Sequence, residues 1–280
     1  MIVCPYDEDQ LMLILQIDHS RIVGMLAAHW GNEVFARLDP YNGMVLAAQE
    51  HDSGWWDWEI KPTLNDKGYP LDYIGSVGAL GPVWLDFYRG AVDRVVARDP
   101  YAGYFVSMHG DGLVTKGMGL LKYMPDWSQA DPKAKAFVDE QHALRARLLA
   151  EMRADPELAG VTTDEHLWTN YKYMEVFDQI GQFICNRYPF NSTARQNGPS
   201  NTLSDVPVPV APGVEDTSML VDVQDEWNAI VKPYPFDTDP LVIPFQGRVV
   251  PNREYESEAE FLRHFYPAER VTWTYSLHAG

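Results

Sequence analysis

Four side chains of metal-ligating type occur where the neighbouring sequence is apolar. They are His19, the adjacent pair His51 and Asp52, and Asp178. A buried acid is costly unless it is paired or coordinates a metal, and a buried imidazole needs partners for its ring nitrogens. Imidazole nitrogens and carboxylate oxygens together suit a divalent ion. We therefore predict that these four residues bind one, with Mn, Fe, Mg, Zn and Ni as the candidates.

Helical spacing is what would bring the four residues together. In the segment 17–30, apolar residues recur at intervals of three and four, and the stripe extends back to His19. In "GMVLAAQEHD" the next member of the apolar stripe is His51. A helix expected over about 164–186 carries Asp178 on its apolar face. Three separate helices should thus direct their polar side chains inward.

A further histidine follows the short apolar segment "YAGYFVSMHGDG". His109 stands there beside glycines, a position that suits an exposed ligand or a substrate contact. We assign it a catalytic role together with Asp52, either touching the substrate or transferring a proton. His142 lies off the apolar stripe of its helix, on which Gln141 falls instead, and its role stays open.

Aromatic and basic residues near these motifs could form a substrate pocket. Trp55 and Trp56 directly follow the His-Asp pair, and they either pack the helix end or floor a pocket. Asp57 and Glu59 are either solvated or supply a general base. Lys116, with Lys61 and Lys122, either neutralises a phosphate or lies in solvent.

Composition limits the partners. The formal charge is −18, which repels nucleic acids and anionic membranes and leaves a small molecule as the expected substrate. The two cysteines, far apart, do not indicate a disulfide framework. Near the N-terminus Asp and Glu stand where a secretory signal would carry Lys or Arg, so a cytoplasmic protein is expected. A homo-oligomer is compatible with these data.

The pattern of periodic segments predicts a mainly α fold. A helical core is expected over residues 1–190, including a β-hairpin near the N-terminus. The stretch 191–280 begins with a linker rich in Ser, Asn and Pro and continues as short β-type runs. We expect it to form a small β-rich appendage packed on the core, with the N-terminal hairpin as a candidate partner.

The order of the candidate ligands resembles that of HD-domain metal-dependent phosphohydrolases, which carry a His, a later His-Asp pair and a distant Asp. The stretches "QIDHSRIVGMLAAHWG", "AAQEHDSGWWDWE", "YFVSMHGDGL" and "PFDTDPLVIPFQGRVVPNREY" also resemble an uncharacterised bacterial family, domain of unknown function 3891. The resemblance implies an HD-like helical fold and supplies no substrate. Superfamily members with two metals have extra histidines between the pair and the last Asp, the interval that holds His109.

Three functions follow as expectations. The first is a metal-dependent hydrolase that acts on a small phosphate ester through a metal-activated water. The second is a di-iron oxygenase on an HD-like scaffold, which would need His109 and another ligand such as His142. The third is a non-catalytic binding or interaction module in which the polar residues are structural.

Overall fold

The protein, described by a computed structural model over residues 1–118, 120, 126–186 and 207–280, mixes helices with one large sheet. About half of it is helical and 19% lies in strands. The expectation of a mainly α fold was therefore wrong. The N-terminal hairpin and the C-terminal β-type runs were expected, but not as one six-stranded layer, because these strands come from opposite ends of the sequence and pair only in the folded chain. The expected division at residues 190 and 191 lies outside the described residues.

Six strands form the sheet, in the order β1-β2-β5-β6-β4-β3. Their bounds are β1 (Ile2–Pro5), β2 (Gln10–Ile14), β3 (Leu220–Asp225), β4 (Asn228–Lys232), β5 (Leu241–Pro251) and β6 (Arg270–Ala279). Neighbouring strands are antiparallel except β4 and β6, which are parallel. Along β5 buried and exposed residues alternate, as expected for a strand with one face on the core.

The N-terminal hairpin is present and joins the C-terminal strands. Strands β1 and β2 pair with Ile2 opposite Ile14, and β2 then pairs with β5, with Leu11 opposite Val250. The β-rich C-terminal part and the hairpin are thus one continuous sheet. This sheet is a full layer of the fold, against which α1 packs.

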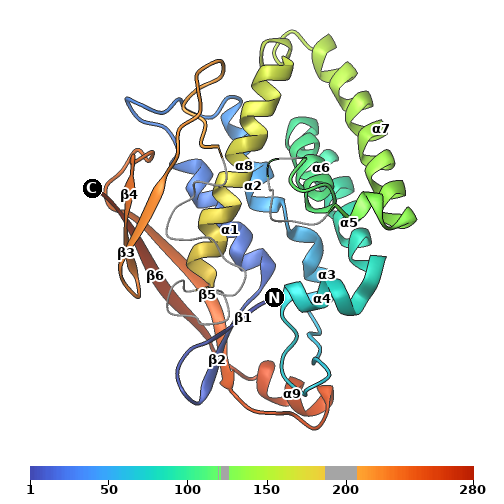
Figure 1. Cartoon of the computed structure of the whole chain (residues 1–280), viewed down its shortest axis with the longest axis vertical. Helices are drawn as coiled ribbons and strands as arrows, with labels where there is room; N and C mark the ends of the chain where they lie inside the picture. Colours follow the sequence, from blue (N-terminus) through green and yellow to red (C-terminus); the bar gives the residue numbers. More distant parts are fainter. Residues whose placement is uncertain (119, 121–125, 187–206) are drawn as a thin grey trace.

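Helices cover the sheet and extend away from it (Figure 1). They are α1 (Gln16–Ala28), α2 (Tyr41–Glu50), α3 (Trp56–Glu59), α4 (Tyr73–Leu80), α5 (Trp84–Val96), α6 (Pro100–Val114), α7 (Pro132–Ala154), α8 (Asp164–Cys185) and α9 (Glu258–Phe265). Figure 1 shows α1, α2 and α8 between the sheet and the group formed by α5, α6 and α7. The metal-ligand candidates lie on this middle layer.

Capping residues explain where the main helices begin. Asp99 accepts hydrogen bonds from the backbone N–H groups of Tyr101 and Ala102, and Pro100 occupies the first turn of α6. Asp131 caps α7 in the same way, and Thr163 caps α8. The segment read as a short run ending at His109 is therefore part of a full helix.

The stretch 61–82 combines loops with a helix. It contains α4, whose first turn is capped by the Asp72 carboxylate through the N–H of Ile74. Glycines and prolines dominated the sequence pattern there, although the helix itself tolerates two glycines. None of the helices in the described ranges is long and apolar enough to cross a membrane.

Candidate metal centre

Four predicted ligands gather in the middle layer of the fold. His19 comes from α1, His51 caps the C-terminus of α2, Asp52 follows it, and Asp178 comes from α8. The Nε2 atom of His19 lies 2.8 Å from the Oδ1 atom of Asp178. The Nε2 atom of His51 lies 3.4 Å from Asp52 Oδ2 and 3.4 Å from Asp178 Oδ1. Helical spacing thus predicted which residues meet.

The ligand atoms form two overlapping triads. His19, His51 and Asp178 make one, and His51, Asp52 and His109 make the other, with the atoms of each triad within 4.8 Å of one another. The four residues expected around one ion are thus divided between the triads. His51 belongs to both, so it is the junction of the cluster.

The cluster is enclosed on most sides. The side chains of His19 and His51 are fully buried, and those of Asp52 and His109 nearly so. Asp178 differs, because 19% of its side chain is exposed. Asp178 is therefore the most solvent-exposed member of the cluster.

The hydrogen bonding of His51 is suited to a metal. Its Nδ1 atom lies 2.8 Å from the carbonyl oxygen of Ala48, which can only accept, so Nδ1 carries a proton. Its Nε2 atom is buried and has no hydrogen-bond partner among the described residues. A neutral ring would direct the Nε2 lone pair at two carboxylates, which is unfavourable unless a cation lies between them. The residues present therefore fit a bound cation at this point.

His19 is held from two sides. Its Nδ1 atom lies 3.8 Å from the Cys185 sulfur, which leaves Nε2 facing Asp178. Gly181 lets the ring approach α8, because a Cβ atom there would stand 2.8 Å from His19 Cε1 and 2.7 Å from Val23 Cγ2. The close packing of α1 on α8 thus sets the position of His19.

His109 joins the cluster, although not as an exposed residue. Its ring is 2% exposed, because α6 faces α2 and α8 at this point. Its Nε2 atom lies 3.7 Å from Asp52 Oδ1, and its Nδ1 atom lies 3.5 Å from Glu175 Oε1. The glycines around it allow close contacts, since a Cβ atom on Gly110 would lie 3.3 Å from atoms of Tyr88 and Phe137.

Tyr88 and Trp55 support Asp52. The Tyr88 hydroxyl donates a 2.7 Å hydrogen bond to Asp52 Oδ1 and accepts one of 2.9 Å from the Trp55 indole N–H. All three residues are buried. Trp55 is therefore a buried residue that is linked to the candidate ligand Asp52 through Tyr88.

Electrostatic coupling among these groups shifts their pKa values. Burial favours the neutral acid, but the hydrogen bond with His19 and the facing ring of His51 outweigh it and hold the pKa of Asp178 well below its usual range. The pKa of Asp52 is lowered to about 2, because His51 and His109 outweigh the effect of burial. Burial lowers and the carboxylates raise the pKa values of His51 and His109, and the carboxylates prevail in both. The cluster therefore favours positive charge at its centre.

Other predicted residues lie away from this centre. Trp56 is 42% exposed, and Lys116 is half-buried at the end of α6 with a φ of 60°. His142 is 57% exposed, and its Nε2 atom lies 2.9 Å from Asp111 instead of joining the cluster. Lys61 is exposed, and Lys122 lies outside the described residues.

The two acids after the tryptophans also serve other contacts. Asp57 is exposed and lies 3.6 Å from Arg94. Glu59 is buried, accepts a 2.8 Å hydrogen bond from the N–H of Gln16 and pairs with the amino group of Met1. Gly54 is required for close packing, because a Cβ atom there would lie 1.9 Å from the carbonyl oxygen of Phe87.

Two members of the site were missed by sequence reasoning. Glu175 stands four residues after Tyr171 and three before Asp178, on the same face of α8, so helical spacing could have identified it. Tyr88 lies 36 positions from Asp52, and no local pattern links them. Its role depends on the packing of α5 against the segment after α2.

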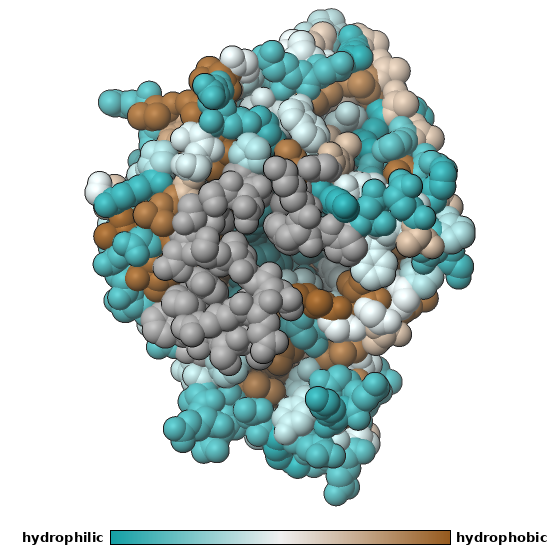
Figure 2. All heavy atoms as spheres, in the orientation of Figure 1, coloured by the Kyte–Doolittle hydropathy of each residue, from teal (hydrophilic) through white to brown (hydrophobic). Residues whose placement is uncertain are grey.

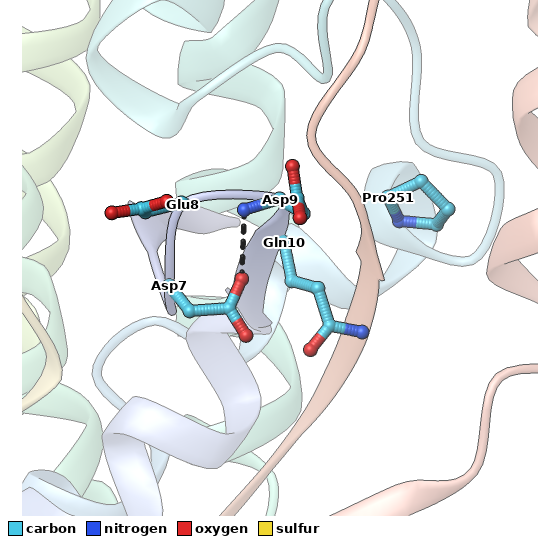
Figure 3. Close-up of a pocket in the computed structure, with 5 residues that line it drawn as sticks. All are labelled: Asp7, Glu8, Asp9, Gln10 and Pro251. Atoms are coloured by element: carbon cyan, nitrogen blue, oxygen red, sulfur yellow. Dashed lines mark hydrogen bonds between the residues drawn. The ribbon is translucent and has the colours of Figure 1, made fainter.

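Two surface hollows lie away from this cluster. One of about 680 Å³ surrounds the turn of the N-terminal hairpin (Figure 3), where Asp7 Oδ1 accepts the N–H of Asp9 at 2.9 Å. Its acidic side chains belong to a solvated turn. On the face in Figure 2, hydrophilic residues predominate and hydrophobic residues occur in small separate groups. The buried cluster is therefore the better candidate for chemistry.

Comparison with known proteins gives a family and no function. The model described as "Protein of unknown function (DUF3891)" matches residues 1–252. No curated protein and no solved structure matches the chain. The resemblance to HD-domain phosphohydrolases thus rests on the residue types and their order alone.

Proposed function

Because the chain belongs to DUF3891, a family of proteins of unknown function, we propose from its site that it is a metal-dependent hydrolase of small phosphate esters. The observation that carries the proposal is the buried, unpartnered Nε2 atom of His51, which faces the carboxylates of Asp52 and Asp178 at 3.4 Å. Mn, Fe, Mg, Zn and Ni are all candidates for the ion.

Each residue has a role in this proposal. His19, His51, Asp52 and Asp178 would hold the ion, as the order of these residues in HD-domain phosphohydrolases suggests. When bound, a divalent ion supplies a Lewis acid that lowers the pKa of a coordinated water and polarises a phosphoryl oxygen. His109 lies across Asp52 from His51, where its Nε2 atom can exchange a proton with a reacting group. Tyr88 holds Asp52 in place through its hydroxyl.

Access and charge both favour a small ligand. The edge at Asp178 is the exposed part of the cluster, so a substrate would approach there. The formal charge of −18 opposes an anionic substrate, and a divalent ion would reverse the field locally. A phosphate ester is then a compatible partner, because its oxygens are hard ligands for the same ion.

The test starts from purified protein treated with chelator and reloaded separately with Mn²⁺, Fe²⁺, Mg²⁺, Zn²⁺ or Ni²⁺. p-Nitrophenyl phosphate and bis(p-nitrophenyl) phosphate serve as generic monoester and diester probes. We expect at least one ion to restore hydrolysis of one probe, with little activity in the chelated protein. A protein that binds an ion but hydrolyses neither probe under any loading would contradict hydrolysis of simple phosphate esters.

The two triads favour a di-iron oxygenase as the second candidate. Asp52 directs Oδ2 at His51 and Oδ1 at His109, so His51, Asp52 and His109 would help to hold a second iron beside the first. The di-iron function predicts two irons per chain, visible absorption and oxygen consumption. The hydrolase function predicts no oxygen consumption. A binding module would need no stoichiometric ion.

A further inference from the structure

Each imidazole of the cluster has one ring nitrogen toward the centre and the other toward an outer partner. The Nδ1 atom of His51 contacts the carbonyl oxygen of Ala48, and that of His19 contacts the Cys185 sulfur. The Nδ1 atom of His109 faces the carboxylate of Glu175. His109 is thus the ring whose outer partner is charged.

The carboxylate of Glu175 is buried and faces the His109 ring. Its side chain is 5% exposed, and Oε1 has no hydrogen-bond partner among the described residues, although it lies 3.5 Å from the Nδ1 atom of His109. The Nδ1 atom of His109 likewise has no hydrogen bond in the described part of the chain. A carboxylate is rarely buried without a cation, a donor or a metal. The mutual approach of two otherwise unpartnered polar atoms explains why an acid occupies this position.

The geometry of α8 links Glu175 to the ligands. Glu175 lies three residues before Asp178, so one helical turn carries both the acid behind His109 and the acid facing His19 and His51. Tyr171, four residues earlier, is buried near the same carboxylate, and burial together with Glu175 raises the pKa of its phenol well above 10.0. The apolar side of α8 thus has a polar strip directed at the cluster.

We propose that Glu175 is a positioning residue for His109. It accepts the Nδ1–H of the ring, fixes the ring plane and leaves the Nε2 lone pair directed at Asp52 and the centre. Histidines in metal sites commonly donate their second N–H to a carboxylate, which sets the tautomer and orientation. The consequence for catalysis rests on the proposed function, but the assignment of the tautomer does not.

Long-range ¹H–¹⁵N NMR of the imidazole rings in metal-free protein tests the assignment directly. Spectra are recorded at a pH at which the His109 ring is neutral, for wild type and for the Glu175→Gln and Glu175→Leu variants. We expect the wild-type ring to carry its proton on Nδ1. Glu175→Gln keeps an accepting oxygen and should retain that tautomer, whereas Glu175→Leu should lose it.

His51 provides a control within the same spectra. Its Nδ1–H is held by the backbone carbonyl of Ala48, so its tautomer should be the same in all three proteins. A general disturbance of the fold would move His51 as well. A wild-type His109 protonated on Nε2 overturns the proposal even if the leucine variant fails to fold, and so does a folded leucine variant that keeps the Nδ1–H form.

Metal binding and hydrolysis are measured on the same variants. We expect metal affinity or turnover to fall about 10- to 100-fold in Glu175→Leu and less in Glu175→Gln. If wild-type protein neither binds an ion nor hydrolyses the probes while the tautomers behave as expected, the proposed function fails and the positioning role stands. If wild type is active and the His109 tautomer is unchanged in Glu175→Leu, the positioning role fails and the proposed function stands.

Discussion

The Nε2 atom of His51 lies 3.4 Å from the Oδ1 atom of Asp178, and these two residues come from helices whose sequences are more than a hundred positions apart. Because the other nitrogen of the ring donates to Ala48, Nε2 has either a lone pair or a proton to direct at the carboxylate. If Nε2 is unprotonated, a cation must lie between its lone pair and the carboxylate. If Nε2 is protonated, the imidazolium ring itself supplies the positive charge. Competition between a proton and a metal ion is therefore central to this site.

Gly181→Ala should disturb the centre through His19. A Cβ atom at this position would stand 2.8 Å from His19 Cε1, so the ring or α1 must shift. We expect a loss of about 1–3 kcal/mol in the free energy of unfolding and a clear fall in metal affinity. Denaturant titration and metal titration measure the two effects.

Gly103→Ala is the matched control, because it also overpacks a helical glycine but against Val96, a residue of α5 outside the cluster. It should lose stability and keep metal affinity. Equal losses of affinity in both variants would show that general packing, and not the position of His19, determines binding.

Tyr88→Phe should lower metal affinity without abolishing metal binding. The variant removes the hydroxyl that donates to Asp52 and leaves the Trp55 N–H without its acceptor. An unsatisfied buried donor costs about 1–3 kcal/mol. We expect that destabilisation, together with a fall of roughly 10- to 100-fold in metal affinity or activity, measured by melting and by metal titration.

Tyr101→Phe is the control that separates loss of stability from loss of metal binding. The Tyr101 hydroxyl also accepts a hydrogen bond from Asn170 and donates one to the carbonyl oxygen of Val161, but in a different part of the core. Its variant should melt earlier and bind metal normally. Unchanged affinity in Tyr88→Phe would remove Tyr88 from the site.

Metal affinity should increase with pH above the ordinary histidine pKa. The folded pKa of His109 lies well above 6.5 and that of His51 is also raised, because facing carboxylates outweigh burial. In metal-free protein the protonated rings thus contribute stability below pH 6.5, and that contribution is lost as pH rises through their folded pKa values. A metal must displace these protons, so binding becomes tighter over the same interval.

Calorimetric titration with Zn²⁺ or Mn²⁺ in buffers of different ionisation enthalpy measures the protons released. We expect net proton release near neutral pH that declines as pH increases. Affinity independent of pH, with no proton released, would show that His51 does not bind the ion.

The sequence was informative about residues that repeat with helical spacing. His19, His51 and Asp178 were placed on inward faces of three helices because apolar neighbours recur around each of them, and the structure encloses the two histidines as expected. Glu175 obeyed the same spacing but was overlooked, since a glutamate in a helix is commonly solvated. Tyr88 reaches Asp52 only through tertiary packing.

The sheet shows the limits of local patterns more clearly. The hairpin of β1 and β2 was expected from two apolar runs on either side of an acidic break, yet its pairing with β5 joins Leu11 to Val250 and depends on the whole chain. The glycines near His109 suggested an exposed segment. In the structure they allow α6 to pack closely, as at Gly103 against Val96 and Gly112 against the Tyr171 hydroxyl.

The metal content of Asp178→Asn beside that of wild type tests the central claim most directly. The asparagine keeps the size of the side chain and removes the charge that offsets a divalent ion. Elemental analysis after dialysis, combined with melting temperatures with and without chelator, measures binding and its coupling to stability. We predict at least one ion per wild-type chain, a melting temperature lowered by chelator, and a variant with little metal whose melting no longer responds to chelator. A metal-free wild type whose variant melts much earlier would contradict the account, because Asp178 would then serve only to pair with His19 and His51.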